Sequence, residues 1–326
     1  MRLPGSTTGP GLAGVELQRG SVDLFYEVLE PTVPGAGTTI LLLNGAGFAS
    51  DMWFADHRSL PDLPPGSDDT GFDVSVAARF TAAGHRVVAI DMRGVGRSGY
   101  ATDAAHGRIA TAALYAEDVA AVLRVAAPEL RRLHVVGMSL GHVVGLALAA
   151  ACPGLVASVS GGGSRACKPP DFFSPLKMHP LPHKALAYAA GTRRVAHGFA
   201  KAIGLEPPAL LARAFMSSPG LDGLFEAMGV AYGTQMAPEQ LAALTGTQVR
   251  YFHATQDNSF TSLEEAKEIY AHCPHCEVIE VDEPTRHAVT GALKPPGHMW
   301  QFDRPGFFVR LMCEAIASAE KAHRET

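Results

Sequence analysis

The sequence predicts an α/β fold in which a mostly parallel central sheet carries helices on both faces and a mainly helical cap is inserted into the chain. Two observations support this prediction. Short apolar runs typical of buried strands alternate with segments in which apolar residues recur at helical spacing. The alternation stops between about Gly162 and Pro238, where prolines and helical stretches replace buried strands, and then resumes.

These observations divide the chain into three parts. Residues 15–163 and 238–326 are expected to form the α/β core, and residues 164–237 the helical cap, or lid, over the strand ends. Residues 1–14 are rich in Gly, Pro, Ser and Thr and are expected to be a disordered N-terminus. Residues 60–72 and 283–296 are expected to be surface loops, and whether they gate a site is not specified by their composition.

Each core element is expected from a local pattern. The expected strands are residues 15–17 and 22–29 (a hairpin around Gly20-Ser21), 39–43, 86–90, 133–136, 155–159, 249–254 and 277–281. The expected helices are residues 74–83, 115–126, 140–151, 263–271 and 307–319. Because parallel strands end at one edge of the sheet, functional residues are expected after their carboxyl ends.

Composition narrows the class of function. The 326 residues are 47% hydrophobic and 18% charged, with a formal net charge of −5, which favours neither nucleic acid nor an anionic membrane as a partner. No apolar run reaches membrane-spanning length, and the N-terminus does not resemble a signal peptide. Five scattered cysteines, including the pair Cys273-Pro-His-Cys276, favour reduced thiols over disulfides or a metal site. We expect a cytoplasmic protein with no metal and no other cofactor.

The segment Gly137-Met138-Ser139-Leu140-Gly141 carries the strongest chemical signal. It fits G-x-S-x-G between an expected strand and an expected helix, the context of a nucleophile elbow. Small residues two places before and after the serine let the backbone turn sharply, and the helix N-terminus favours developing negative charge. A chain with 34 glycines also produces such a pattern by chance, so the strand–helix context carries the interpretation.

With this motif the sequence resembles the α/β-hydrolase superfamily over nearly its whole length, because four further landmarks follow in that family's order. They are Leu43-Asn44-Gly45-Ala46-Gly47 at the oxyanion loop, Asp91-Met92-Arg93-Gly94-Val95-Gly96-Arg97-Ser98-Gly99 at the D-x-R-G-x-G-x-S segment, Ala254-Thr255-Gln256-Asp257 at the triad acid, and Gly297-His298-Met299-Trp300 at the catalytic histidine. Asn44 stands where the family more usually has histidine. This difference leaves the main-chain donors in place and is expected to alter the loop's hydrogen bonds.

The glycines of the second landmark also satisfy G-x-G-x-x-G, a dinucleotide-binding pattern. We do not expect a dinucleotide site, because this is not the first βαβ unit of the chain and no helix is expected to open directly on Gly99.

The resemblance implies a triad of Ser139, Asp257 and His298. Ser139 attacks an acyl carbon, His298 takes its proton and returns it to the leaving group, and Asp257 orients His298. The backbone N–H groups of Ala46 and Leu140 are expected to bind the oxyanion. Two alternatives are weighed against this assignment. His287 also lies between the last expected strand and helix, but the Gly-His context favours His298; Asp171 is the alternative acid, at a proline-flanked cap position.

His142 departs from the family pattern, which usually has glycine or alanine at that position. It is expected either to form a pocket wall or to be a packed imidazole bonded to a nearby backbone carbonyl. His134 and His253 lie in expected strands and are expected to be structural. The candidate substrate-pocket residues are Phe48, Met138, His142, Phe172, Phe173 and Met299.

The cap offers one clue to the substrate. From Ser164 to Leu205 it has seven basic residues and one acidic residue, a balance that would suit an anionic or carrier-linked substrate or belong to an ordinary solvated helical surface.

We therefore expect a serine hydrolase that cleaves a carboxylic ester, thioester or lactone of a small, partly apolar substrate through an acyl-enzyme on Ser139. A C–C hydrolase or an acyltransferase would use the same triad, and a cofactor-independent lyase or cyclase would use the pocket without an acyl-enzyme. A receptor-like homologue would bind a ligand without turnover. These alternatives stay open, and the sequence does not specify the oligomeric state.

Overall fold

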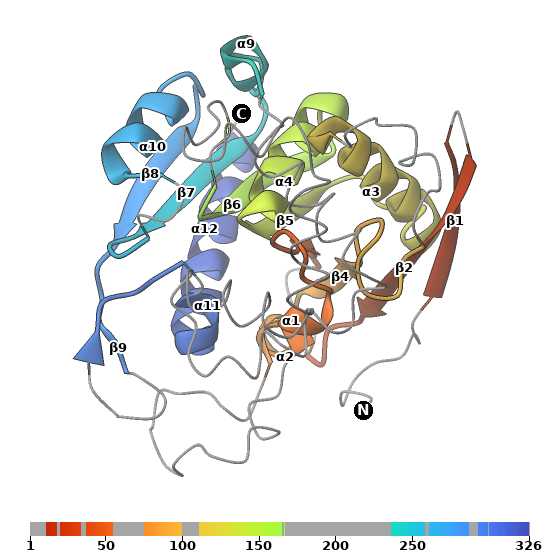
Figure 1. The fold of residues 1–326 in the computed structure, drawn as a ribbon, viewed down its shortest axis with the longest axis horizontal. Coiled ribbons are helices and arrows are strands. Elements are labelled where there is room, and N and C mark those ends of the chain that lie inside the picture. Colours follow the sequence, from red (N-terminus) through yellow and green to blue (C-terminus); the bar gives the residue numbers. More distant parts are fainter. Residues whose placement is uncertain are drawn as a thin grey trace, which may run out of the picture.

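The computed structural model describes residues 11–17, 20–33, 37–54, 75–99, 111–164, 166, 236–257, 261–286, 293–298 and 300–325. One sheet crosses the molecule in the order β1-β2-β4-β3-β5-β6-β7-β8 (Figure 1). Its strands are β1 (Gly11–Leu17), β2 (Gly20–Leu29), β3 (Thr39–Leu43), β4 (Arg86–Ile90), β5 (Leu133–Met138), β6 (Val156–Gly162), β7 (Gln248–Ala254) and β8 (Cys276–Val281). Neighbours from β4 to β8 pair in parallel, whereas β1 and β2 form an antiparallel hairpin at the edge.

Helices cover both faces of this sheet, as the sequence predicts. The described helices are α1 (Asp51–Phe54), α2 (Val76–Ala82), α3 (Ala112–Ala126), α4 (Leu140–Ala151), α9 (Pro238–Ala242), α10 (Leu263–Tyr270), α11 (Trp300–Asp303) and α12 (Pro305–Glu325). One hydrophobic cluster joins α3, α4, α9 and α10 to one face, and a second joins α1, α2, α11 and α12 to the other. Because both faces are covered, strands such as β3 are buried at every position and consist almost entirely of apolar residues.

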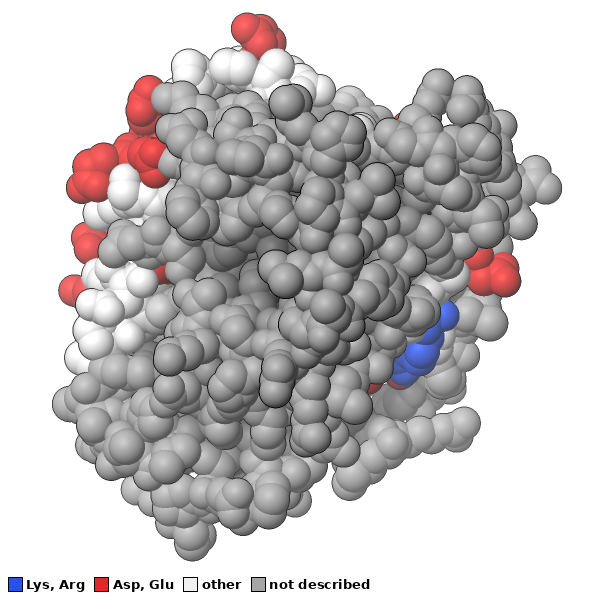
Figure 2. Space-filling view, in the orientation of Figure 1, with Lys and Arg blue, Asp and Glu red and all other residues white. Residues whose placement is uncertain are grey.

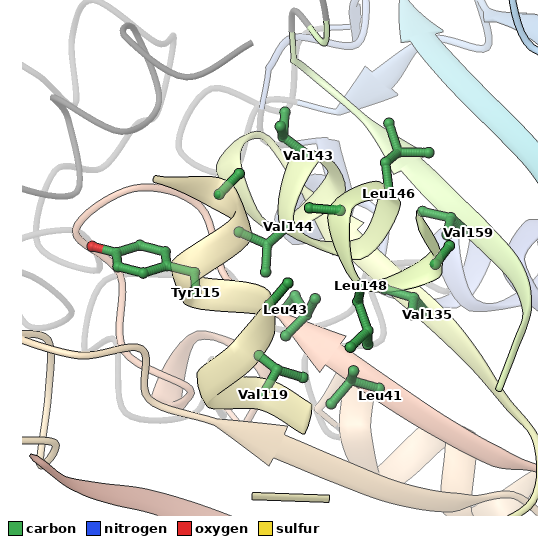
Figure 3. Close-up of a cluster of buried hydrophobic side chains, with 14 of the residues drawn as sticks. Leu41, Leu43, Tyr115, Val119, Val135, Val143, Val144, Leu146, Leu148 and Val159 are labelled. Atoms are coloured by element: carbon green, nitrogen blue, oxygen red, sulfur yellow. The ribbon is translucent and has the colours of Figure 1, made fainter. Parts of the chain in front are cut away.

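The first cluster fixes α4 on the sheet, directly behind the elbow serine. In Figure 3 the side chains of α3 and α4 interdigitate with those of β3, β5 and β6. Val144 and Leu148 of α4 and Leu41 of β3 are completely buried there. A rigid α4 holds the turn that precedes it in one position, and this is what a site at the end of β5 requires.

The structure corrects the sequence predictions at two places. β1 begins at Gly11 and pairs from there with Tyr26, so residues 11–14 belong to a strand and not to a disordered N-terminus. Within the expected loop 283–296, Thr285–Arg286 (β9) pairs with Leu293–Lys294 (β10) as a two-stranded antiparallel sheet. Residues 1–10 and 60–72 lie outside the described residues.

The expected cap leaves and re-enters the core at one point. Met236 N–H donates to the carbonyl of Ala166 at 2.7 Å, and both side chains are buried in the first cluster. Both ends of the insertion therefore lie beside the carboxyl end of β6. Residues 165 and 167–235 lie outside the described residues, so the helical character of the cap stays a prediction.

The surface of the described residues is acidic along one edge. Exposed side chains of α9, α10 and β8 form this edge, at the upper left in Figure 2. They include Glu239, Glu264, Glu268, Glu277 and Glu280. An acidic edge is unfavourable for a nucleic-acid backbone. No helix among the described residues is both long and apolar enough to cross a membrane.

Candidate active site

Ser139 occupies the turn between β5 and α4 in a conformation that costs energy. Its φ of 54° and ψ of −120° make it the one non-glycine residue with positive φ among those described. Such a conformation costs about 1–3 kcal/mol and persists only where the surroundings enforce it. Neighbouring main-chain atoms leave no room for a side chain at either flanking glycine. A Cβ on Gly141 would lie 2.2 Å from the Leu43 carbonyl oxygen, and a Cβ on Gly137 would lie 2.5 Å from the Gly141 carbonyl oxygen. The G-x-S-x-G segment thus forms the sharp elbow that its spacing predicts.

Asp257 and His298 form a buried acid–imidazole pair. Asp257 follows β7 and His298 follows β10, and His298 Nδ1 lies 2.9 Å from Asp257 Oδ2, with each side chain 4% exposed. An ionised carboxylate only accepts, so Nδ1 carries the proton and donates. The other ring nitrogen, Nε2, is then the basic one, as a proton-accepting histidine requires.

The end of β6 links Ser139 to this pair. The Ser139 N–H donates to the carbonyl of Gly162 at 2.7 Å. The next residue, Gly163, lies against the acid–imidazole pair, because a Cβ built on it would be 2.6 Å from His298 Cε1 and 3.3 Å from Asp257 Oδ2. Gly162 and Gly163 are adjacent, so one short segment contacts both the Ser139 main chain and the Asp257–His298 pair, whose members are 41 residues apart in sequence. That the three residues act as a triad stays a prediction.

The expected oxyanion loop lies beside the serine. A Cβ on Gly45 would lie 3.6 Å from Ser139 Cβ, which places the turn carrying Ala46 next to Ser139. Leu140 is the first residue of α4, where N–H groups have no intrahelical acceptor. Leu140 therefore adjoins Ser139 in the chain and Ala46 adjoins the residue that approaches it, and their role as oxyanion donors stays a prediction.

Asn44 anchors this loop in a way that the sequence did not specify. Its Nδ2 donates to the carbonyl of Ile90 at 2.9 Å, and its Oδ1 accepts from the Trp53 indole Nε1 at 2.6 Å. Asn44 is fully buried, so these bonds tie the loop to the end of β4 and to α1 without solvent competition. The asparagine thus satisfies both of its polar atoms within the core.

The D-x-R-G-x-G-x-S segment is structural. Buried Asp91 accepts from Ser50 N at 2.6 Å and from Arg97 N at 2.9 Å, which joins this segment to the N-terminus of α1. Gly94 N–H donates to the carbonyl of Gly99 at 2.9 Å, so the glycines close a tight turn. Their spacing serves this turn, and a dinucleotide site is not needed to explain it.

The remaining predicted residues fall into two groups. Phe48 and Met138 are buried in the second hydrophobic cluster, with 3% and 0% exposure, and a pocket-lining role for them stays a prediction. The others lie outside the described residues: Phe172, Phe173 and Met299 of the predicted pocket, and the alternative acid Asp171 and base His287.

His142 is a packed imidazole, but its partners differ from the predicted backbone carbonyl. Its Nδ1 lies 3.1 Å from Ser164 Oγ and 3.1 Å from Tyr270 OH. Its ring makes edge contacts with Tyr251 and Tyr270, and it is fully buried. Burial lowers its pKa to about 3, so the ring is neutral near pH 7. The sequence does not indicate these contacts, because His142 and its partners come from parts of the chain that are far apart in sequence.

The two histidines that the sequence places in strands, His134 and His253, lie in β5 and β7. His134 contacts Ser158 Oγ at 2.8 Å and Glu320 Oε1 at 3.0 Å, and burial lowers its pKa to about 4. His253 is buried in β7 and stacks on Tyr251. Cys273 and Cys276 are free thiols. Among the described residues, no group of three His, Cys, Asp or Glu side chains is arranged to hold a metal ion.

Comparison with known proteins agrees with this geometry. A family model described as the alpha/beta hydrolase family matches residues 40–311. The chain belongs to the alpha/beta hydrolase family. This membership supports hydrolase activity and accounts for the strand–elbow–helix arrangement at Ser139.

Curated relatives match part of the chain. Putative carbamate hydrolases named RutD are similar to it: that of Variovorax paradoxus (strain S110) is 35% identical over 136 residues, and that of Azorhizobium caulinodans is 33% identical over 141 residues. These matches span 42% and 43% of this chain and 40% and 41% of the relatives, or about two fifths of their length.

Solved structures of hydrolases are similar over almost the whole chain. A thermophilic esterase from Thermogutta terrifontis aligns with a TM-score of 0.66 at 17% identity, covering 96% of this chain and 99% of that one. The enol-lactonase from Burkholderia xenovorans LB400 aligns with a TM-score of 0.63 at 16% identity, covering 91% and 97%. At such identities the likeness shows the shared fold alone.

Proposed function

We propose that this hydrolase cleaves a carboxylic ester, thioester or lactone of a small, partly apolar substrate through an acyl-enzyme on Ser139. In this mechanism His298 Nε2 takes the Ser139 proton as Oγ attacks the acyl carbon, and the Ala46 and Leu140 N–H groups bind the oxyanion. His298 then protonates the leaving group. Water, deprotonated by the same imidazole, releases the acid and regenerates Ser139.

One observation carries the proposal. The only described non-glycine residue with positive φ is the elbow serine, and the segment that binds its N–H also contacts the buried Asp257–His298 pair. Strain of this kind concentrates at functional sites, where it presents a side chain that a relaxed turn would not present. Asp257 stabilises the imidazolium that forms during attack, because the two side chains are buried together.

The test uses the nucleophile itself. Wild-type protein is expected to hydrolyse short p-nitrophenyl esters and to be labelled by a fluorophosphonate probe, and Ser139→Ala is expected to abolish both. Ser318→Ala serves as the matched control. The Ser318 hydroxyl lies on α12, distant in sequence from the elbow, and accepts from Arg250 Nη2 of β7, so its removal should leave both readouts unchanged. Full labelling of Ser139→Ala would refute the assignment.

Carbamate hydrolysis is a second candidate, because the two curated relatives carry that description in their names. A carbamate would carbamoylate Ser139 through the same oxyanion site. The two candidates separate in a comparison of p-nitrophenyl acetate with p-nitrophenyl N-methylcarbamate. Sustained carbamate turnover favours the second candidate, and a single stoichiometric burst followed by inhibition favours the first.

The remaining alternatives give different products. An acyltransferase diverts the acyl group to an added alcohol, and a C–C hydrolase cleaves a diketone-type bond while esters are poor substrates. A lyase or cyclase retains activity in Ser139→Ala, and a receptor binds ligand tightly with negligible turnover. An anionic or carrier-linked substrate and a cytoplasmic location stay predictions from the sequence.

A further inference from the structure

A buried polar cluster lies behind the end of β6, outside the groups that the proposed acyl transfer uses. It consists of His142 of α4, Ser164 after β6, Tyr251 of β7 and Tyr270 of α10, and all four side chains are buried. The two tyrosine rings lie 4.6 Å apart, and the His142 ring meets both edge-on at 5.5 and 5.7 Å. The cluster is thus both hydrogen-bonded and tightly packed.

Ser164 is the residue on which these bonds converge. The Tyr251 hydroxyl donates to the Ser164 carbonyl at 3.1 Å and accepts from the Ser164 N–H at 3.3 Å, so one hydroxyl holds both main-chain groups. The Ser164 hydroxyl lies 3.1 Å from His142 Nδ1 and 3.5 Å from Tyr270 OH. Three secondary-structure elements therefore fix one residue at the end of β6.

The two residues before Ser164 contact the proposed triad from both sides. Gly162 accepts the hydrogen bond of Ser139 N–H, and Gly163, at φ 71°, lies against His298 and Asp257. A displacement of Ser164 is passed along the backbone to both contacts, because only one or two residues separate them. The distance from the serine to the imidazole is thereby coupled to the cluster.

We propose that the His142–Ser164–Tyr251–Tyr270 cluster positions the proposed triad, holding residues 162–164 so that Ser139 and His298 stay in register for proton transfer. This inference rests on the proposed function. The four residues act through Gly162 and Gly163, so they are positioning residues. Misplacement of reacting groups by about 1 Å lowers the rate on the order of 100-fold. Loss of the hydrogen bonds that fix this segment is therefore expected to lower activity strongly.

The neutral state of His142 suits this role. Its Nδ1 faces two hydroxyls, and within the described part of the chain its Nε2 meets no hydrogen-bond partner, so a second ring proton would place a charge and another donor in the core. A neutral, fully buried imidazole keeps one arrangement of hydrogen bonds over the pH range in which the enzyme would work.

The test removes one hydroxyl at a time and keeps the rings. Tyr251→Phe deletes the group that holds both Ser164 main-chain atoms, and Tyr270→Phe deletes a weaker contact to the same residue. Thr247→Val is the matched control, because the Thr247 hydroxyl donates at 2.9 Å to the carbonyl of Val156, at the opposite end of β6. All three variants lose one buried hydroxyl beside the same strand.

The readouts are kcat and KM for a p-nitrophenyl ester, the second-order rate of fluorophosphonate labelling, and the midpoint of urea unfolding. We expect Tyr251→Phe to lower kcat and the labelling rate by about 10- to 100-fold with KM within about twofold, Tyr270→Phe to do so less, and Thr247→Val to leave kcat and labelling unchanged. Should Tyr251→Phe fail to fold, Tyr270→Phe carries the test.

Three results overturn the inference: wild-type kcat in both tyrosine variants, a parallel loss in Thr247→Val, or a change confined to KM. Failure of the proposed function is distinguishable, since wild-type protein itself would then be neither labelled nor active.

Discussion

Replacing Gly163 with alanine tests the geometry of the site most directly. At φ 71° an L-residue is strained, and alanine there costs about 1–2 kcal/mol of folding free energy. The added Cβ would lie 2.6 Å from His298 Cε1 and 2.9 Å from Nδ1, whereas ordinary contact begins at 3.4 Å. The imidazole must therefore move by nearly an ångström. Such a shift predicts a loss of about 100-fold in kcat/KM for an ester substrate.

Gly154→Ala is the control that separates the effect of backbone strain from the effect of contact with His298. Gly154 also has positive φ, at 84°, but a Cβ on it meets nothing within 4 Å. Gly154→Ala should therefore lose a similar amount of stability in urea and keep wild-type kcat/KM. The reasoning is refuted if Gly163→Ala retains wild-type activity, or if both variants lose activity equally at equal stability.

Two further predictions concern Asn44 and His142. Asn44→Ala removes the side chain that pairs with the buried Trp53 indole N–H and Ile90 carbonyl. It should lower the free energy of unfolding, measured in urea, by about 1–3 kcal/mol for each group. An unchanged free energy of unfolding would contradict the role of Asn44 as an anchor. His142 has a pKa of about 3 when folded against 6.5 in its ordinary state, so the unfolded chain binds the extra proton as pH falls through 6.5. Stability should fall below that pH by up to about 1.4 kcal/mol per pH unit from this group, and His142→Gln should reduce the slope between pH 6 and pH 4. An identical slope in the variant would contradict this.

Local patterns were sufficient for most core elements. β3 and β4 begin and end where the sequence predicts, because strands buried on both faces are continuous apolar runs. The predicted strand at residues 15–17 begins later than β1, because residues 11–14 have a loop-like composition and form a strand through pairing with β2, which no local pattern encodes. The two-residue strands β9 and β10 are too short to produce an alternating pattern.

The elbow was predictable for the same reason, since a strand, a turn and a helix are adjacent in sequence around Ser139. The environment of His142 was not, because its partners Ser164 and Tyr270 are 22 and 128 residues away. Contacts of that separation depend on how the strands are ordered in the sheet. Periodicity and composition do not specify that order.

The end of β6 shows why these long-range contacts matter for function. Within five residues, Gly162 binds the Ser139 N–H, Gly163 contacts His298, Ser164 is held by Tyr251, and Ala166 accepts from Met236 at the return of the insertion. None of the four carries acyl-transfer chemistry in its own side chain, so motif reasoning passes over all of them. Because they are consecutive or nearly so, a change at any one alters the backbone that the others share. The proton-transfer geometry proposed for Ser139 would therefore depend on this segment as a whole, which contacts from α4, β7 and α10 support.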